Sequence, residues 1–183
     1  MQRAGRTIWF VLAGWLVLAV ATACSSSAPE PHQSQATPTL APSSAPASGN
    51  PRALARQAYL GMWQAFVAAS RTADYQSASL AHYAAGDALS LLTRGLYQNY
   101  RNGIVTRGRP SFHPDVTIAS SNDAAAQATV VDCADSSHWV DYYKSGKPAP
   151  GEAQGRQRIY ARLRPFDGEW KVTYLVVEKV GTC

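Results

Sequence analysis

The sequence predicts an α+β fold, in which helices pack on one face of a curved antiparallel sheet. Two observations carry this prediction. Between residues 51 and 102 apolar residues recur at the 3.6-residue period of amphipathic helices, and after Gly103 they recur at the period of two that strands show. Near the end of the chain, an Asp-Gly dipeptide joins two long alternating segments, which is a strong marker of a β-hairpin. Helices followed by antiparallel strands are typical of the α+β class.

Three helices are predicted, over residues 51–73, 77–83 and 87–102. Asn50 is a favourable cap for the first helix, and Pro51 suits its first turn. Gly86 is expected to end the second helix and Gly103 the third, because glycine readily adopts the left-handed conformation that follows a helix. The inner stripe of the third helix is expected to consist of Leu89, Leu92, Leu96 and Tyr100.

Six strands are predicted, over residues 104–106, 116–120, 124–132, 138–143, 156–166 and 169–180, with a turn at Asn122-Asp123. The Asp167-Gly168 turn pairs Phe166 with Glu169. This register sets Leu163 opposite Val172, Ala161 opposite Tyr174 and Ile159 opposite Val176. The face turned toward the helices is then expected to carry Ile159, Ala161, Leu163, Trp170, Val172, Tyr174 and Val176.

Changes in composition divide the chain into three parts. Arg3 and Arg6 precede an uncharged run over residues 7–23, which is the layout of a secretory signal. Residues 25–50 are dominated by Ser, Ala, Pro and Thr and lack the apolar residues that would offset ordering entropy, so a disordered tether is expected. Such a tether spans about 30 Å as flexible coil and up to about 80 Å when stretched. Residues 51–183 suit a single domain.

Charge and motifs argue against several classes of function. The formal net charge of +5 falls to +3 once Arg3 and Arg6 leave with the signal, and the domain has no run of Lys or Arg, so nucleic-acid binding is not expected. No histidine pair has metal-ligand spacing, and no phosphate-binding loop or catalytic-triad signature is present, so neither a metal nor a cofactor is expected. The aromatic residues Tyr59, Trp63, Phe66 and Trp170 are expected to be core residues.

The start of the chain resembles a bacterial lipoprotein signal. Ala21-Thr22-Ala23-Cys24 lies where that family has its lipobox, although the family prefers Leu where this chain has Ala21. The resemblance implies that residues 1–23 are removed, that Cys24 is lipidated, and that the domain is held at the extracytoplasmic face of the cell membrane. The alternative is an ordinarily processed signal with a chance cysteine, which would give a secreted protein.

The domain resembles the nuclear transport factor 2-like (SnoaL-like, cystatin-like α+β) superfamily, in the form found in actinobacterial lipoproteins. The resemblance covers residues 52–180, and its motifs are Tyr-Leu-Gly-Met-Trp (59–63), Asp-Cys-Ala-Asp-Ser-Ser (132–137) and Gly-Glu-Trp-Lys-Val (168–172). It implies a cone-shaped fold whose open end holds a pocket. Some members are isomerases or dehydratases, whereas many are binding modules.

The remaining cysteines are expected to form a disulfide. With Cys24 assigned to lipid, Cys133 and Cys183 remain in an exported domain, where disulfides are favoured. Closing a loop of about 50 residues contributes about 4 kcal/mol in the chain-entropy model. The rival interpretation is a reactive Cys133 thiol, which would need a base such as His138 five residues away.

Two functional hypotheses follow. The leading one is a non-catalytic accessory module, anchored to the membrane by lipid, that binds an envelope protein or a small apolar ligand. The alternative is a pocket enzyme of the isomerase, dehydratase or cyclase type, in which Asp132 is the base and His138, Tyr142 and Tyr160 complete the site. A structural interpretation of the same region is that Asp132 and Asp135 bracket a turn and bind its backbone amides.

Overall fold

The structure is a computed structural model that describes residues 49–120, 126–151 and 153–183. The predicted signal, Cys24, most of the tether, the turn at Asn122-Asp123 and the predicted start of the third strand at Ala124 lie outside the described residues. The elements are, in chain order, α1 (Pro51–Ser70), α2 (Ala78–Tyr83), α3 (Gly86–Asn102), β1 (Ile104–Gly108), β2 (Asp115–Ser120), β3 (Gln127–Asp135), β4 (Trp139–Tyr143), β5 (Arg156–Phe166) and β6 (Glu169–Val180).

The first helix begins at its predicted cap but ends earlier than predicted, and Gly86 has a different role from the predicted one. The Asn50 side chain accepts a hydrogen bond of 2.9 Å from the backbone N–H of Arg52, which confirms the predicted start of α1. The helix ends at Ser70, three residues earlier than predicted, and Ala73 follows with a φ of 56°. Gly86 opens α3 instead of ending α2, because its φ of 56° turns the chain between the two helices.

The C-terminal turn of α3 corrects one predicted core residue. Gly103 is left-handed and donates to the carbonyls of Asn99 and Tyr100, as a glycine stop should. Leu92 and Leu96 are buried as predicted, but Tyr100 is 48 % exposed. The helix extends past the edge of the core at this end, where the Tyr100 ring contacts Tyr75 and the Lys144 ammonium group instead.

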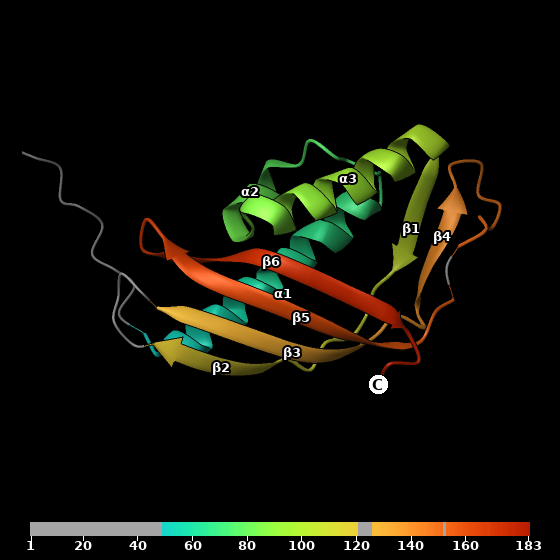
Figure 1. The fold of residues 1–183 in the computed structure, drawn as a ribbon. Coiled ribbons are helices and arrows are strands. Elements are labelled where there is room, and N and C mark those ends of the chain that lie inside the picture. Colours follow the sequence, from blue (N-terminus) through green and yellow to red (C-terminus); the bar gives the residue numbers. More distant parts are fainter. Residues whose placement is uncertain (1–48, 121–125, 152) are drawn as a thin grey trace, which may run out of the picture. The chain divides into compact units, whose positions relative to one another are not determined.

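The strands form two antiparallel sheets (Figure 1). The larger is four-stranded and open, in the order β2-β3-β5-β6, and the smaller pairs β1 with β4. The edge of β6 is partly covered by the segment between α2 and α3, because Ala84 bridges Val172 and the N–H of Ala85 donates to the Val172 carbonyl. The α+β class is therefore confirmed, with helices on one side of an antiparallel sheet.

The β5–β6 hairpin confirms the predicted turn and corrects the predicted register. Phe166 faces Glu169 and Leu163 faces Val172, but a β-bulge then inserts one extra residue, Thr173, into β6. Ala161 consequently faces Leu175 instead of Tyr174, and Ile159 faces Val177 instead of Val176.

The bulge reverses which residues of β6 point inward beyond it. Leu175 is buried, whereas Tyr174, predicted to face the helices, is 37 % exposed and lies under the Arg162 guanidinium at 4.3 Å. The prediction for Tyr174 was wrong because it assumed that side chains alternate between the two faces along all of β6, whereas the bulge at Thr173 interrupts this alternation.

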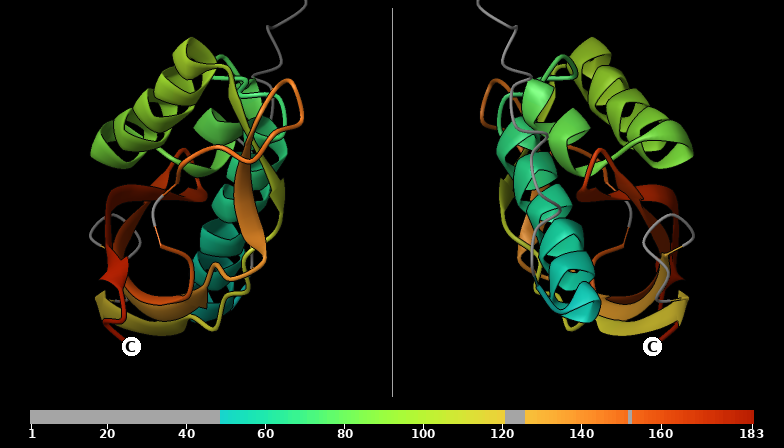
Figure 2. Two further views of the ribbon diagram at one scale, coloured as in Figure 1. Left: turned by 90° about the vertical axis from the view of Figure 1, so that its right-hand side faces the viewer. Right: turned by 90° about the vertical axis from the view of Figure 1, so that its left-hand side faces the viewer.

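The core lies between the inner face of the larger sheet and the helices. Figure 2 shows α1 lying across the curved sheet, with α2 and α3 above it. α1 contacts β2, β3 and β6, and α3 contacts β6 and β1. No helix in the described part of the chain is both long enough and apolar enough to span a membrane. The largest fully buried apolar side chains are Tyr59, Met62, Leu80, Leu96, Ile159, Leu163, Val130 and Val172.

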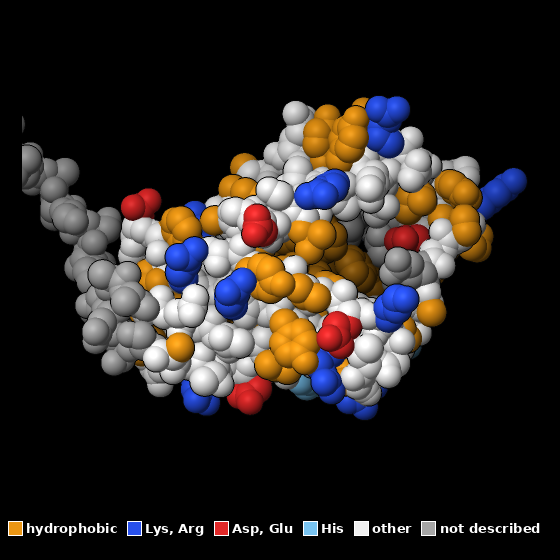
Figure 3. Space-filling view, in the orientation of Figure 1, with side chains coloured by type: hydrophobic (Ala, Val, Ile, Leu, Met, Phe, Trp, Pro, Cys, Tyr) orange, Lys and Arg blue, Asp and Glu red, His pale blue; other side chains and the backbone are white. Residues whose placement is uncertain are grey.

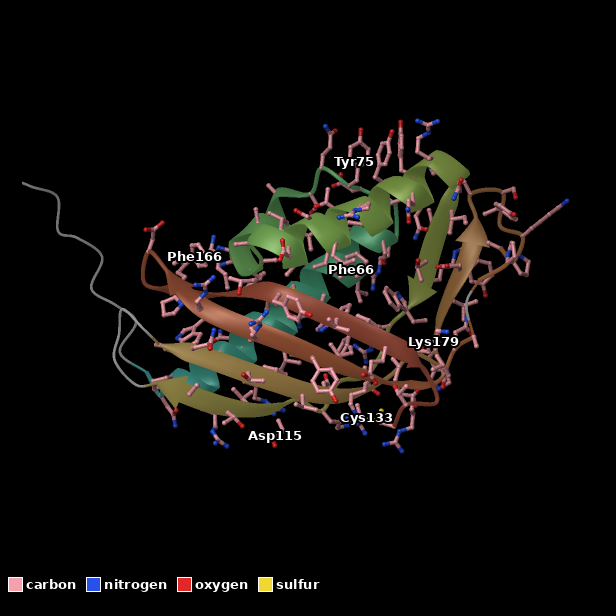
Figure 4. The ribbon with its side chains drawn as sticks, in the orientation of Figure 1. Phe66, Tyr75, Asp115, Cys133, Phe166 and Lys179 are labelled. Atoms are coloured by element: carbon pink, nitrogen blue, oxygen red, sulfur yellow. A yellow bond between two sulfur atoms is a disulfide. The ribbon has the colours of Figure 1, made fainter. Side chains whose placement is uncertain are left out.

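Cys133 and Cys183 form a disulfide, as predicted, with their Cα atoms 5.9 Å apart. Cys133 is on β3, close to its end, and Cys183 follows β6, so the bond joins two strands that are separated in the sheet by β5. The Arg156 guanidinium donates to the Cys133 sulfur, which is visible near the end of β3 in Figure 4.

Candidate ligand-binding site

Asp132, the base of the enzyme hypothesis, is buried beneath α1. Its side chain lies on the inner face of β3 and is only 2 % exposed. The Tyr59 hydroxyl donates to Oδ2 at 2.9 Å, and the backbone N–H of His113 donates to Oδ1 at 2.8 Å. Both carboxylate oxygens are therefore used to join β3 to α1 and to the segment before β2.

The same contact changes the acidity of Tyr59. Burial, and then the neighbouring Asp132 carboxylate, raise the pKa of the Tyr59 hydroxyl far above its ordinary value, and the Trp63 indole opposes them only in part. The hydroxyl is held in its protonated form as a hydrogen-bond donor. A tyrosine locked in this way is suited to structural support of Asp132.

The other three predicted catalytic residues lie elsewhere. His138 is exposed in the turn before β4, and Tyr142 is on β4 beside the Arg107 guanidinium, 4.9 Å from its ring centre. Tyr160 lies between the buried Ile159 and Ala161 on β5, so alternation points its side chain away from the core. The structure therefore does not bring His138, Tyr142 and Tyr160 together around Asp132. The separation arises because the four residues occupy different faces of three strands and a turn.

The alternative interpretation, that Asp132 and Asp135 bind backbone amides of a turn, fits Asp135 fully and Asp132 in part. Asp135 accepts from the N–H and the hydroxyl of Ser137, and these two hydrogen bonds lower the pKa of the Asp135 carboxyl. Asp135 thus stabilises the turn before β4, as predicted. Asp132 also accepts from a backbone amide, but from that of His113, outside the turn.

A cavity of about 640 Å³ lies instead between α1, α3 and the inner face of β5 and β6. Figure 3 shows hydrophobic side chains gathered around a hollow beneath α3, and Figure 4 places Phe66 in that region. The volume is within the range of small-molecule sites, about 300–1,000 Å³. The lining residues are Trp63, Phe66, Leu91, Leu92, Gly95, Pro110, Phe112, Ala134, Ser136, Trp139, Gln157, Ile159, Leu175, Val176 and Val177.

Aromatic rings form one wall of this cavity. The Trp63 ring stacks on Phe112 with centroids 5.0 Å apart and meets Phe66 edge to face, and Phe66 in turn meets Trp139 at 5.8 Å. Trp63 is a buried core residue, as predicted, and Phe66 is partly buried against the core, and both also line the cavity. Their three-residue spacing on α1 places them on one face of the helix, but no sequence signal separates a core aromatic from one that lines a cavity.

A second, smaller cavity of about 320 Å³ adjoins the first. The two share Phe66, Ser136, Trp139 and Gln157. The Thr106 hydroxyl donates to Asp141 Oδ1 at 2.6 Å in its wall. The described residues that line only this cavity are mostly polar: Ser70, Asn99, Thr106, Asp141, Ala153 and Gln154.

The Trp139 indole N–H is a buried donor without a hydrogen-bond partner among the described residues. The Trp63 indole N–H is buried without a partner in the same way. Trp139 lines both cavities with other parts of its side chain, because its Nε1 atom is inaccessible to solvent. Buried donors are nearly always paired in folded proteins, and an unpaired one calls for an explanation. Among the residues whose structure is described, no group of three His, Cys, Asp or Glu side chains is placed to hold a metal ion.

Comparison with known proteins identifies no relative by sequence. No family model and no curated protein matches the chain. Among solved structures, the chain is similar to the intermembrane space region of the chloroplast protein ARC6, with a TM-score of 0.41 and 16 % sequence identity. The match covers 68 % of this chain and 96 % of that one.

Proposed function

We propose that this protein is a lipid-anchored module of the bacterial cell envelope whose domain binds a small apolar ligand without catalysing a reaction. The observation that carries the proposal is the 640 Å³ cavity, because a space of this size lined by aromatic and aliphatic side chains is the usual form of a small-molecule site.

The anchor and the wider family belong to the same proposal. The lipobox-like Ala21 to Cys24 and the tether over residues 25–50 support attachment of the domain to the extracytoplasmic face of a membrane. We assign the domain to the nuclear transport factor 2-like superfamily, with a cystatin-like cone. Helices packed on one side of a curved antiparallel sheet, with a cavity between them, support that assignment.

The enzyme hypothesis has less support. Asp132 is bound by two donors and is not among the residues lining the cavity, and neither are His138, Tyr142 and Tyr160. The described lining of the larger cavity contains no carboxylate, histidine, lysine or tyrosine that would act as an acid or base. Binding therefore explains the geometry with fewer assumptions than turnover does.

Filling the cavity tests the proposal directly. Gly95 lines it from α3, and a Cβ added there would meet no atom within 4 Å. Gly95→Phe in the full chain carrying Cys24→Ser should place a ring in the cavity and weaken binding of the neutral apolar dye Nile red at least about tenfold, or ~1.4 kcal/mol. The matched control is Gln98→Phe, which adds the same ring at an exposed position on α3. Equal dye binding by both variants and the parent would contradict the proposed site.

The anchor needs a separate test. Cys24→Ser should abolish partitioning of the protein into the membrane fraction while leaving the melting temperature of the domain unchanged, because the tether separates the two. Radiolabelled fatty acid fed to the expressing cells should label the parent chain and not the variant. A parent chain without label would remove the lipid anchor from the proposal and leave the cavity unaffected.

A further inference from the structure

Three tyrosine rings gather at the C-terminal end of α3, and none of them lines either cavity described above. Tyr97 and Tyr100 are on α3 and are 41 % and 48 % exposed. The Tyr75 ring meets both, with its centroid 5.2 Å from that of Tyr97 and 5.1 Å from that of Tyr100. Figure 4 shows Tyr75 on the side of α3 away from the larger sheet. Exposed apolar groups that form one patch mark interaction sites, and we call these three residues the tyrosine cluster.

Two cationic side chains lie against this cluster. The Arg101 guanidinium donates to the Tyr97 hydroxyl at 3.1 Å, and its central carbon is 5.9 Å from the centre of that ring. The Lys144 ammonium is 5.2 Å from the centre of the Tyr100 ring. Lys144 follows β4, but its backbone N–H donates to the Gly103 carbonyl at 2.8 Å, which holds it beside the end of α3. Two elements therefore converge to build one surface that is both aromatic and positively charged.

The segments around the cluster are rich in positive charge. Residues 71–77, 94–104 and 142–148 contain five Lys or Arg side chains and one acidic side chain, Asp74. Figure 3 shows basic and hydrophobic side chains next to one another at this end of α3. A surface with such an excess of positive charge attracts anions.

The two cations that touch the cluster have no carboxylate partner in the described part of the chain. The one ion pair found there joins His82 to Glu169, which lie on α2 and β6. Arg101 also suits the negative end of the α3 dipole. That role does not account for Lys144, because Lys144 comes from the segment after β4. Both charges are therefore free to meet an anionic partner.

Phospholipid headgroups suit both properties of this surface. Tyrosine is enriched at membrane–water interfaces, because its ring is apolar while its hydroxyl group stays hydrated. Lys and Arg side chains close to an anionic bilayer are attracted by its surface potential, and their long stems let the charged ends reach the headgroups. The tyrosine cluster and its two cations combine these features in one exposed patch.

The expected tether allows this end of the domain to reach the membrane. Tyr75 follows the C-terminal end of α1, whose 20 residues measure about 30 Å. The tether joins the other end of that helix and spans up to about 80 Å when stretched, so it is long enough for the domain to turn. A tethered domain also meets the membrane at a high effective concentration, so weak contacts suffice to orient it.

We propose that the tyrosine cluster, together with Arg101 and Lys144, is a docking surface for anionic phospholipid headgroups, and that it turns the domain toward the membrane that holds its anchor. The orientation of the anchored protein rests on the proposed function, because it assumes the lipid on Cys24. The affinity of the surface for anionic lipid does not depend on that assumption.

Chemical footprinting tests the proposal. The full chain carrying Cys24→Ser is mixed with vesicles of phosphatidylcholine, alone or with phosphatidylglycerol, and its lysines are briefly acetylated. Vesicles that contain phosphatidylglycerol should slow acetylation of Lys144 and of the exposed Lys147 severalfold. Lys179 should be unaffected, because it is exposed on β6, away from the cluster (Figure 4). Any contact that residues 1–23 make with lipid is common to every variant compared below.

The lipid composition and the control lysine decide the result. Equal protection of Lys144 by both kinds of vesicle would overturn the preference for anionic lipid, and equal protection of Lys179 would overturn the assigned surface. Absence of protection would overturn the proposal whether or not the anchor exists, because Cys24→Ser removes the acyl chains from this test. Fatty-acid labelling of the parent chain tests the anchor separately.

Charge reversal then locates the surface. Arg101→Glu/Lys144→Glu should abolish the protection of Lys147 by phosphatidylglycerol vesicles. The matched control is Arg164→Glu/Lys179→Glu, which reverses one Arg and one Lys at exposed positions of the larger sheet and should leave that protection intact. Loss of protection in both variants would show that the vesicles attract the net charge of the chain and not this surface.

A second pair of substitutions tests the rings while both cations stay. Tyr97→Ser/Tyr100→Ser should reduce the protection of Lys144 severalfold, whereas Gln98→Ser, at an exposed position on the same helix, should not. The substituted side chains are all exposed, so melting temperatures close to that of the parent should confirm that the variants fold. A footprint that is unchanged by loss of both rings would overturn the role of the tyrosine cluster.

Discussion

At the scale of single residues, Asp132 shows how a catalytic candidate becomes a structural support. Alternation along β3 turns its side chain inward, together with those of Val130 and Ala128. Its partners were not predictable, because Tyr59 is 73 positions away in the sequence and His113 contributes a backbone amide. A local pattern specifies the direction of a side chain on a strand, whereas what covers that side chain depends on how α1 and the segment before β2 pack.

Removing the Tyr59 hydroxyl should destabilise the domain without creating a cavity. Tyr59→Phe leaves one oxygen of the buried Asp132 carboxylate without its donor. The expected loss is about 1–3 kcal/mol in the free energy of unfolding, the usual cost of an unsatisfied buried group. Urea unfolding of the parent and the variant measures it. Tyr160→Phe, which changes a tyrosine on the other face of the sheet, serves as the control and should have a smaller effect.

The raised pKa of Tyr59 also predicts a dependence of stability on alkaline pH. The folded-state pKa exceeds the unfolded value of about 10, so above that pH the folded state retains a proton that the unfolded state loses. The contribution of Tyr59 to stability is fully present below about pH 10 and decreases as pH rises above it.

Denaturant midpoints at increasing alkaline pH should fall more steeply for the parent than for Tyr59→Phe, which lacks this titrating group. Parallel pH profiles for the two proteins would show that Tyr59 does not titrate as described.

At the scale of elements, two helical glycines that look alike in the sequence have opposite surroundings. A Cβ on Gly61 in α1 would lie 2.5 Å from the Tyr83 ring of α2, whereas a Cβ on Gly95 in α3 would meet nothing within 4 Å. The first glycine allows two helices to approach closely, and the second leaves space open in the cavity.

The same substitution should therefore have opposite signs at the two positions. Gly61→Ala should destabilise the domain by about 1–2 kcal/mol, because overpacking against Tyr83 outweighs the gain in helix propensity. Gly95→Ala should stabilise it by about 0.5–1 kcal/mol, because only the propensity gain applies. Thermal unfolding of the two variants beside the parent measures both effects. If both substitutions raised or both lowered the melting temperature, the packing described for one of the two helices would be wrong.

Prediction of the elements succeeded where a local residue determines the geometry. Asn50 marked the start of α1, Gly103 marked the end of α3, and Asp167-Gly168 marked the hairpin turn. The bulge at Thr173 was not predicted, because no residue typical of a bulge occurs there. One extra residue was enough to reverse the inward and outward positions after it.

At the scale of the whole molecule, the disulfide should be a major source of stability. Cys133 and Cys183 are 50 residues apart, and Cys133→Ser should lower the free energy of unfolding by about 2–5 kcal/mol. The double variant Cys133→Ser/Cys183→Ser should match the single one, since both remove the same bond. Denaturant unfolding without reductant provides the measurement. Stability of either variant equal to that of the parent would show that the bond does not form in solution.

The fold class could be predicted from periodicity and the hairpin, and the disulfide was expected once the resemblance had assigned Cys24 to lipid, but the cavity could not be predicted. Its walls come from α1, α3, the segment before β2, the region from the end of β3 to the start of β4, and the last two strands, which are far apart in the sequence. In the sequence, Asp132 was the candidate catalytic residue because carboxylates act as acids and bases. The cavity is instead lined by Trp63, Phe66 and Trp139, and these residue types also occur in any core.

The disulfide has a further consequence for amide hydrogen exchange. β5 lies between the strands that the bond joins, and at that end the Gly181 N–H donates to the Arg156 carbonyl and the Arg158 N–H donates to the Thr182 hydroxyl. The disulfide ties the chain end after β6 to β3 across β5, so we expect these two amides to exchange slowly while the bond is intact. Reduction should let β6 fray from this end and speed their exchange, while amides beside the Asp167-Gly168 turn keep their rates.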